Sequence, residues 1–115
     1  MTLREKQSLF ASLVAKLIIW AYSNGYELTF GEVLRTAAQA AANAASGAGI
    51  VHSLHLLSLA VDFHLYKDGV YLKETEQYKV MGEYWKTLHP LCRWGGDFHT
   101  RQDGNHFSIE HEGVK

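Results

Sequence analysis

The side chains with the clearest potential for chemistry are two histidines and two aspartates. His55 and Asp62 lie seven residues apart in a largely apolar stretch, and His106 follows a turn-forming segment near the end of the chain. Two histidines and one carboxylate are a common ligand set of catalytic zinc, which leaves a fourth position for water. These three residues are therefore candidate zinc ligands. Asp103, three residues before His106, is a candidate general base that accepts a proton from the water.

The spacing of His55 and Asp62 restricts the backbone between them. On a regular strand an odd separation points two side chains to opposite faces, so they can share a metal only if the chain turns or bulges. Ser58 is the expected place for that turn. A helix would bring both residues to one face without a break. The β-branched and aromatic residues after Ala60 nevertheless favour a loop followed by a strand.

The elements that must position these residues are indicated by the apolar periodicity. Helical spacing predicts a helix over 3–23, with Gly25 suited to a left-handed cap just beyond its end. A second helix with an apolar stripe is predicted over 74–89. The predicted strands cover 26–34, 60–66, 70–72 and 106–110. Two loop-like segments are predicted, over 36–49 and 91–104, and the first of them is alanine-rich and expected to be mobile. This mixture predicts a single α+β domain over 1–115, with a small antiparallel sheet packed against helices and the zinc site in a cleft on the sheet.

The composition excludes some classes of function. The 115-residue chain carries 11 basic and 12 acidic side chains, a net charge of −1, which argues against nucleic-acid binding by a broad cationic surface. Cys92 is the only cysteine, so the chain cannot form an internal disulfide or a multi-cysteine zinc site. The apolar run 13–22 is interrupted by Lys16 and is too short to span a bilayer. No membrane insertion and no signal peptide are therefore expected.

Three segments of the sequence resemble one known family. Residues 53–62, SLHLLSLAVD, resemble the S-x-H-x-x-G-x-A-x-D signature of the LAS-type zinc peptidases, with Ser58 where that family usually has glycine. Residues 31–36, GEVLRT, resemble its G-E-x-x-R-T segment, and residues 94–107 resemble its W-G-G-D-F…D-x-x-H-F ending. The family includes D-Ala-D-Ala carboxypeptidases and dipeptidases, and the phage L-alanyl-D-glutamate endopeptidases. Aspartate in D-x-x-H is similar to the phage enzymes.

The resemblance implies a role for each matching residue. It implies that zinc is held by the three candidate ligands and that Asp103 is the catalytic carboxylate. It also implies that Arg35 lies in the active site and holds a substrate carboxylate or stabilises the oxyanion. Ser53 would lie beside the metal cleft, where we predict that it contacts substrate. Trp94 is either a core anchor or a wall of the substrate cleft, and we predict that it contacts substrate. His64 shares strand parity with Asp62 and is a candidate substitute ligand or supporting residue.

The resemblance implies hydrolysis of an amide bond in the peptidoglycan stem peptide, as in a phage L-alanyl-D-glutamate endopeptidase. A D,D-carboxypeptidase or D-Ala-D-Ala dipeptidase is the first alternative, and a non-catalytic zinc-binding module that recognises cell wall or a partner protein is the second. Full-length phage lysins of this type often carry an additional wall-binding module, whereas this chain is expected to be a monomer without a separate wall-binding domain. It would stay in the host cytoplasm until its release to the wall, or be associated with the virion.

Overall fold

The computed structural model describes residues 1–33 and 54–115, which form an antiparallel sheet with two α-helices. The strand order is β1-β2-β5-β4, and β3 pairs with β2. This architecture confirms the predicted α+β class, and the alanine-rich segment 36–49 lies outside the described residues. The helices are α1 (Leu3–Ser23) and α3 (Lys79–Leu88), the strands are β1 (Tyr26–Phe30), β2 (Ala60–Lys67), β3 (Val70–Leu72), β4 (Cys92–Trp94) and β5 (His106–Ile109), and the short 3-10 helices are η1 (Leu54–Leu57), η2 (Thr75–Tyr78) and η3 (Gly95–Asp97).

Helix α1 begins and ends with local signals that its sequence carries. Thr2 and Glu5 form a reciprocal capping box, in which each side chain accepts a hydrogen bond from the other residue's backbone N–H. Gly25, just beyond the helix, adopts the left-handed φ of 83° that the sequence predicts for it. The buried face consists of Phe10, Leu13, Leu17 and Ala21. Within the described part of the chain, no helix is long and apolar enough to cross a membrane.

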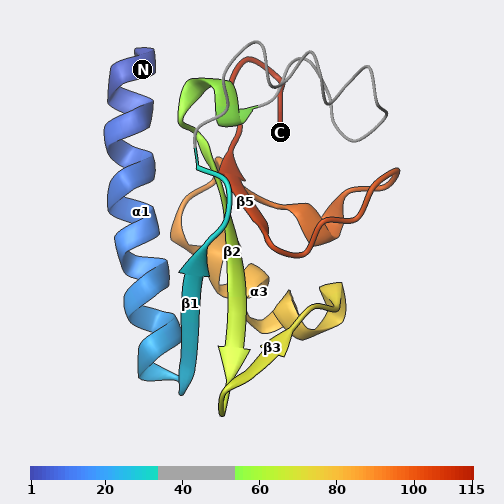
Figure 1. Cartoon of the computed structure of the whole chain (residues 1–115). Helices are drawn as coiled ribbons and strands as arrows, with labels where there is room; N and C mark the ends of the chain where they lie inside the picture. The colour runs from blue at the N-terminus through green and yellow to red at the C-terminus, as the bar shows by residue number, and fades with distance from the viewer. Residues whose placement is uncertain (34–53) are drawn as a thin grey trace.

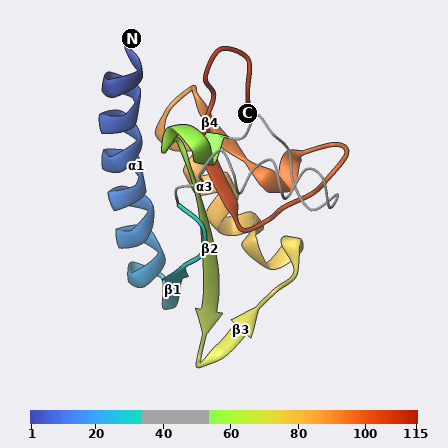
Figure 2. The same cartoon turned by 45° about the horizontal axis from the view of Figure 1, so that its top comes forward.

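The alternation of β2 divides the sheet into two different faces. Its residues Val61, Phe63 and Leu65 are at most 1% exposed, whereas Asp62, His64 and Tyr66, which alternate with them, are only half-buried. Phe63 contacts Phe107 of β5, which in turn contacts Trp85 of α3. The helices therefore cover one face of the sheet, with α1 beside β1 and α3 behind β2 (Figure 1 and Figure 2). The other face, called the open face below, carries Asp62 and His64.

The second half of the chain departs from the predicted elements in two places. The predicted helix over 74–89 begins with η2, and α3 covers only Lys79–Leu88, with Val80 of the predicted stripe 57% exposed. The prediction of a loop over 91–104 is wrong at Cys92–Trp94, which forms β4. This short strand exists because it pairs with β5, a partner that no local pattern reveals. The hairpin of β2 and β3 is confirmed, and Asp68 and Gly69 have the positive φ values of its turn.

The thiol of Cys92 is expected to be unreactive in the folded protein. Cys92 is 3% exposed, and burial raises its pKa to about 11, so that the reactive thiolate is scarce near pH 8. We expect labelling by a thiol reagent to be at least about 100-fold slower in the native protein than in urea-unfolded protein. The measurement is the rate of absorbance change with Ellman's reagent at pH 8. A native rate within about threefold of the unfolded rate would contradict the burial of β4.

Candidate metal centre

His55 reaches the open face of the sheet through a turn. It lies on η1, is 2% exposed, and is followed by Ser58, which has a positive φ of 55°. Serine tolerates this conformation less well than glycine because its Cβ meets the backbone. The reversal at Ser58 is the turn that the seven-residue spacing requires, and β2 starts two residues later at Ala60.

Asp62 and His106 are brought together by strand pairing. They are direct partners in the antiparallel register of β2 and β5. Opposed residues on one face of an antiparallel pair have Cβ atoms about 4.5–5.5 Å apart. Asp62 is half-buried and His106 is 8% exposed, so both side chains are largely shielded from solvent.

The distances within this cluster fit a tetrahedral zinc ion. Asp62 Oδ1 lies 3.4 Å from His55 Nε2 and 3.3 Å from His106 Nδ1. Two ligand atoms that are each about 2.0–2.1 Å from a tetrahedral zinc ion lie about 3.4 Å apart. One ligand atom from each of the three residues lies within 4.8 Å of the others. Asp62 Oδ1 is also buried, and the two histidine nitrogens converge on it, as expected of a group of atoms that binds one metal ion.

A backbone carbonyl completes the support of His55. Its Nδ1 lies 3.4 Å from the carbonyl oxygen of Val33, which leaves Nε2 directed toward Asp62. Metal-binding histidines usually donate their second ring nitrogen to a carbonyl or carboxylate in this way, which fixes the tautomer. The sequence reasoning missed Val33, because a backbone carbonyl acceptor does not depend on the type of side chain.

The charges of the cluster stabilise one another when metal is absent. Burial by itself would raise the pKa of Asp62, but hydrogen bonds from His106 and His55 outweigh it and lower that pKa to about 2. Burial by itself would lower the pKa of His55, but its hydrogen bond with Asp62 and the nearby negative charge outweigh it and raise that pKa. Asp62 is therefore ionised at neutral pH, which is the form that binds a cation.

Asp103 stands at the edge of the cluster on the loop before β5. Its backbone N–H donates to Gly95 O at 3.0 Å, and its carbonyl accepts from His106 N at 3.0 Å. Although the residue as a whole is exposed, partial loss of hydration raises the pKa of its carboxyl, and the negative charge of Asp62 raises it further. A carboxylate so placed, with a raised pKa, is suited to accept and release a proton beside a metal.

Trp94 holds the loop that carries Asp103. Trp94 is 4% exposed, and its indole Nε1–H donates a hydrogen bond to Gly104 O at 2.7 Å. Lys86 Nζ lies over the same ring and donates to Asp97 Oδ2 at 2.8 Å. Substrate contact by Trp94 stays a prediction, and the structure gives it a positioning contact. The predicted site residues Arg35 and Ser53 lie outside the described residues.

Gly95 is the tightest point of this loop. A Cβ at Gly95 would collide with the carbonyl oxygen of Asp103, which is backbone and cannot rotate away. We expect Gly95→Ala to lower the free energy of unfolding by about 1–3 kcal/mol, as overpacking does. Urea denaturation followed by tryptophan fluorescence measures the change.

Gly25→Asn is the control for the loss of glycine itself. Nothing lies within 4 Å of a Cβ at Gly25, and asparagine tolerates its left-handed φ of 83°. This variant is expected to change the unfolding free energy by less than about 1 kcal/mol. If Gly95→Ala is no less stable than Gly25→Asn, the prediction that Gly95 lies too close to the Asp103 carbonyl for a side chain is wrong.

Comparison with known proteins places this geometry among peptidases. A family model of the M15 peptidases, described as D-alanyl-D-alanine carboxypeptidase, matches residues 46–109. The L-alanyl-D-glutamate peptidase of Listeria phage A118 is 35% identical over 104 residues. This match covers 85% of the present chain and 36% of the phage protein, so the chain spans about a third of the length of that relative.

Two solved structures share the fold. The L-Ala D-Glu endopeptidase ChiX of Serratia marcescens superposes with a TM-score of 0.75 at 22% identity, covering 88% of this chain and 77% of its own. The vancomycin-resistance D,D-pentapeptidase VanY, solved in complex with Zn(II), superposes with a TM-score of 0.59 at 19% identity. This match covers 87% of the present chain and 70% of the VanY chain. At these identities the likeness shows a shared fold.

Proposed function

Because the chain belongs to the M15 family of peptidases, we propose that it is a zinc-dependent peptidase that hydrolyses the L-alanyl-D-glutamate bond of peptidoglycan stem peptides. The observation that carries the proposal is the cluster of His55, Asp62 and His106 at zinc-ligand spacing, with Asp103 beside it. The name of the phage relative, L-alanyl-D-glutamate peptidase, supports the choice of bond.

The three clustered residues would hold the zinc ion. When bound, zinc supplies polarisation of the scissile carbonyl and a lower pKa for water. The Asp103 carboxylate accepts the proton of the attacking water and returns it to the leaving amine. Its raised pKa favours both transfers, because a proton carrier works best when its pKa lies near the working pH. Arg35 and Ser53 stay predicted substrate contacts, as does the monomeric single-domain organisation of residues 1–115.

A D,D-carboxypeptidase is the second candidate. The description of the family model and the fold shared with VanY favour it. The same residues would serve, because both reactions add water to an amide next to a D-amino acid. The two candidates differ in the substrate and in the product released.

Digestion of purified sacculi by the zinc-loaded protein distinguishes the candidates. Mass spectrometry is expected to find new N-terminal D-glutamate, whereas released D-alanine would favour the carboxypeptidase. A chelator should stop the reaction, and added zinc should restore it. If sacculi yield no product while the protein holds stoichiometric zinc, hydrolysis is contradicted and the chain is a zinc-binding module.

A further inference from the structure

His64 lies beside the candidate metal centre on β2 but outside its group of three ligands. It follows Asp62 by two residues on β2, so its side chain shares the open face of the sheet. Residues two apart on a strand are about 6.6 Å apart, roughly the length of two residues of an extended peptide. The group of potential metal ligands in the described residues consists of His55, Asp62 and His106, without His64.

The imidazole of His64 leans along the strand toward Asp62. A Cβ built on Gly31 would lie 3.1 Å from His64 Nε2 and also 3.1 Å from Asp62 Cβ. The two side chains therefore approach the same point, which the absence of a side chain at Gly31 leaves open. Gly31 is fixed there, because its N–H donates to Asp62 O at 2.7 Å.

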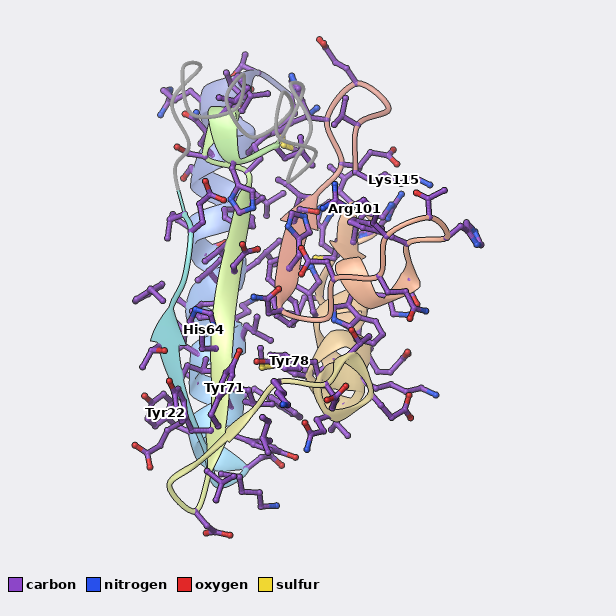
Figure 3. All side chains as sticks on the ribbon, turned by 45° about the vertical axis from the view of Figure 1, so that its right-hand side comes forward. Tyr22, His64, Tyr71, Tyr78, Arg101 and Lys115 are labelled. Carbon is purple, nitrogen blue, oxygen red and sulfur yellow. The ribbon has the colours of Figure 1, made fainter. Side chains whose placement is uncertain are left out.

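Tyr71 of β3 holds the other side of the ring. The rings of His64 and Tyr71, both labelled in Figure 3, meet edge to face with centroids 5.8 Å apart. The ring of Tyr66 lies against that of Tyr71, with centroids 5.5 Å apart. Tyr71 is 46% exposed. A half-buried imidazole and an exposed aromatic ring thus continue the open face away from the metal centre toward β3.

One ring nitrogen of His64, Nδ1, makes no hydrogen bond within the described residues. This nitrogen is buried. A buried polar atom without a partner costs about 1–3 kcal/mol, so such atoms mark places where a ligand or water completes the structure. A flip of the ring by about 180° around χ2 leaves its plane unchanged and exchanges the positions of its nitrogen and carbon atoms, so that a nitrogen can meet a ligand on either side.

We propose that His64 binds substrate: its imidazole hydrogen-bonds the main chain of the peptide one or two residues from the scissile amide. Tyr71 acts as a positioning residue that fixes the imidazole plane. This inference rests on the proposed peptidase function. It assigns the strip from Asp62 to Tyr71 as the path of an extended peptide, whose spacing of polar groups matches that of a strand.

The first test is kinetic and uses soluble stem peptides with the zinc-loaded full chain. His64→Ala is expected to raise KM about 3- to 10-fold, the loss of one hydrogen bond, with kcat within about twofold and zinc content unchanged. His64→Phe keeps an aromatic ring against Tyr71 and is expected to be equally impaired, whereas His64→Gln keeps an N–H donor and is expected to recover part of the loss. An unchanged KM in His64→Ala, or wild-type behaviour of His64→Phe, would overturn the inference.

His89→Ala is the control for removal of a histidine elsewhere. His89 follows α3, on the helix-covered side of the molecule, and its Nδ1 accepts from Leu91 N at 3.1 Å. The KM of the His89→Ala protein is expected to equal that of the wild type. Loss of zinc from His64→Ala would also overturn the inference, because it would place His64 in support of the metal.

Binding without turnover separates this inference from the proposed function. Calorimetry measures the affinity of the same peptide for the Asp103→Asn protein, with and without His64→Ala. We expect His64→Ala to weaken binding about 3- to 10-fold. If the wild type fails to cleave sacculi but peptide binding still depends on His64, the hydrolytic function fails and the binding site stands. If the wild type cleaves and peptide binding ignores His64, only the present inference fails.

Discussion

Replacing His106 by alanine is expected to remove the metal from the protein and to lower peptidase activity by at least about 1,000-fold. His106 supplies one of three ligands, and its Nδ1 lies 3.3 Å from the shared carboxylate oxygen of Asp62. A catalytic zinc site needs three protein ligands, and this variant keeps only two. The measurements are zinc content after dialysis and the rate of product release from sacculi.

His111→Ala is the matched control for this variant. His111 is a half-buried histidine whose Nδ1 contacts Lys6 Nζ at 3.0 Å, and it lies outside the ligand cluster. It is expected to retain zinc and activity. Full zinc content and activity in His106→Ala would show that the cluster does not hold the catalytic metal.

Local chemistry explains which elements could be predicted from the sequence. Helix α1 carries its own cap at Thr2 and its own stop at Gly25, and the β2–β3 hairpin carries Asp68 and Gly69 at its turn. These signals act within a few residues, so they can be interpreted without knowing the fold. The turn at Ser58 followed from the parity of two residues, and its positive φ was found where that argument placed it.

The remaining features depend on distant partners. The three residues of β4 form a strand because β5 pairs with them, and the apolar face of β5 requires α3 to cover it. The carbonyl of Val33 supports His55 across 22 positions of sequence. The unused nitrogen of His64 is visible only after folding, because its neighbours come from β1 and β3.

The catalytic carboxylate is expected to be separable from the metal site. Asp103→Asn keeps the size of the side chain but removes its ability to accept a proton, so we expect kcat to fall about 100- to 10,000-fold. Zinc content should stay at the wild-type level, because Asp103 is not one of the three clustered ligands. Asp103→Glu keeps a carboxylate with a longer reach and is expected to retain more activity than Asp103→Asn.

Asp97→Asn tests whether any aspartate of this loop would give the same result. Asp97 lies near Asp103 in sequence, but its carboxylate pairs with Lys86 Nζ at 2.8 Å and its side chain is 50% exposed. Exposed ion pairs contribute at most about 1 kcal/mol, so the loss of activity should stay below about fivefold. Equal losses in Asp97→Asn and Asp103→Asn would mean that the loop needs its charges for shape. A selective loss in Asp103→Asn, with zinc retained, would assign the proton transfer to Asp103.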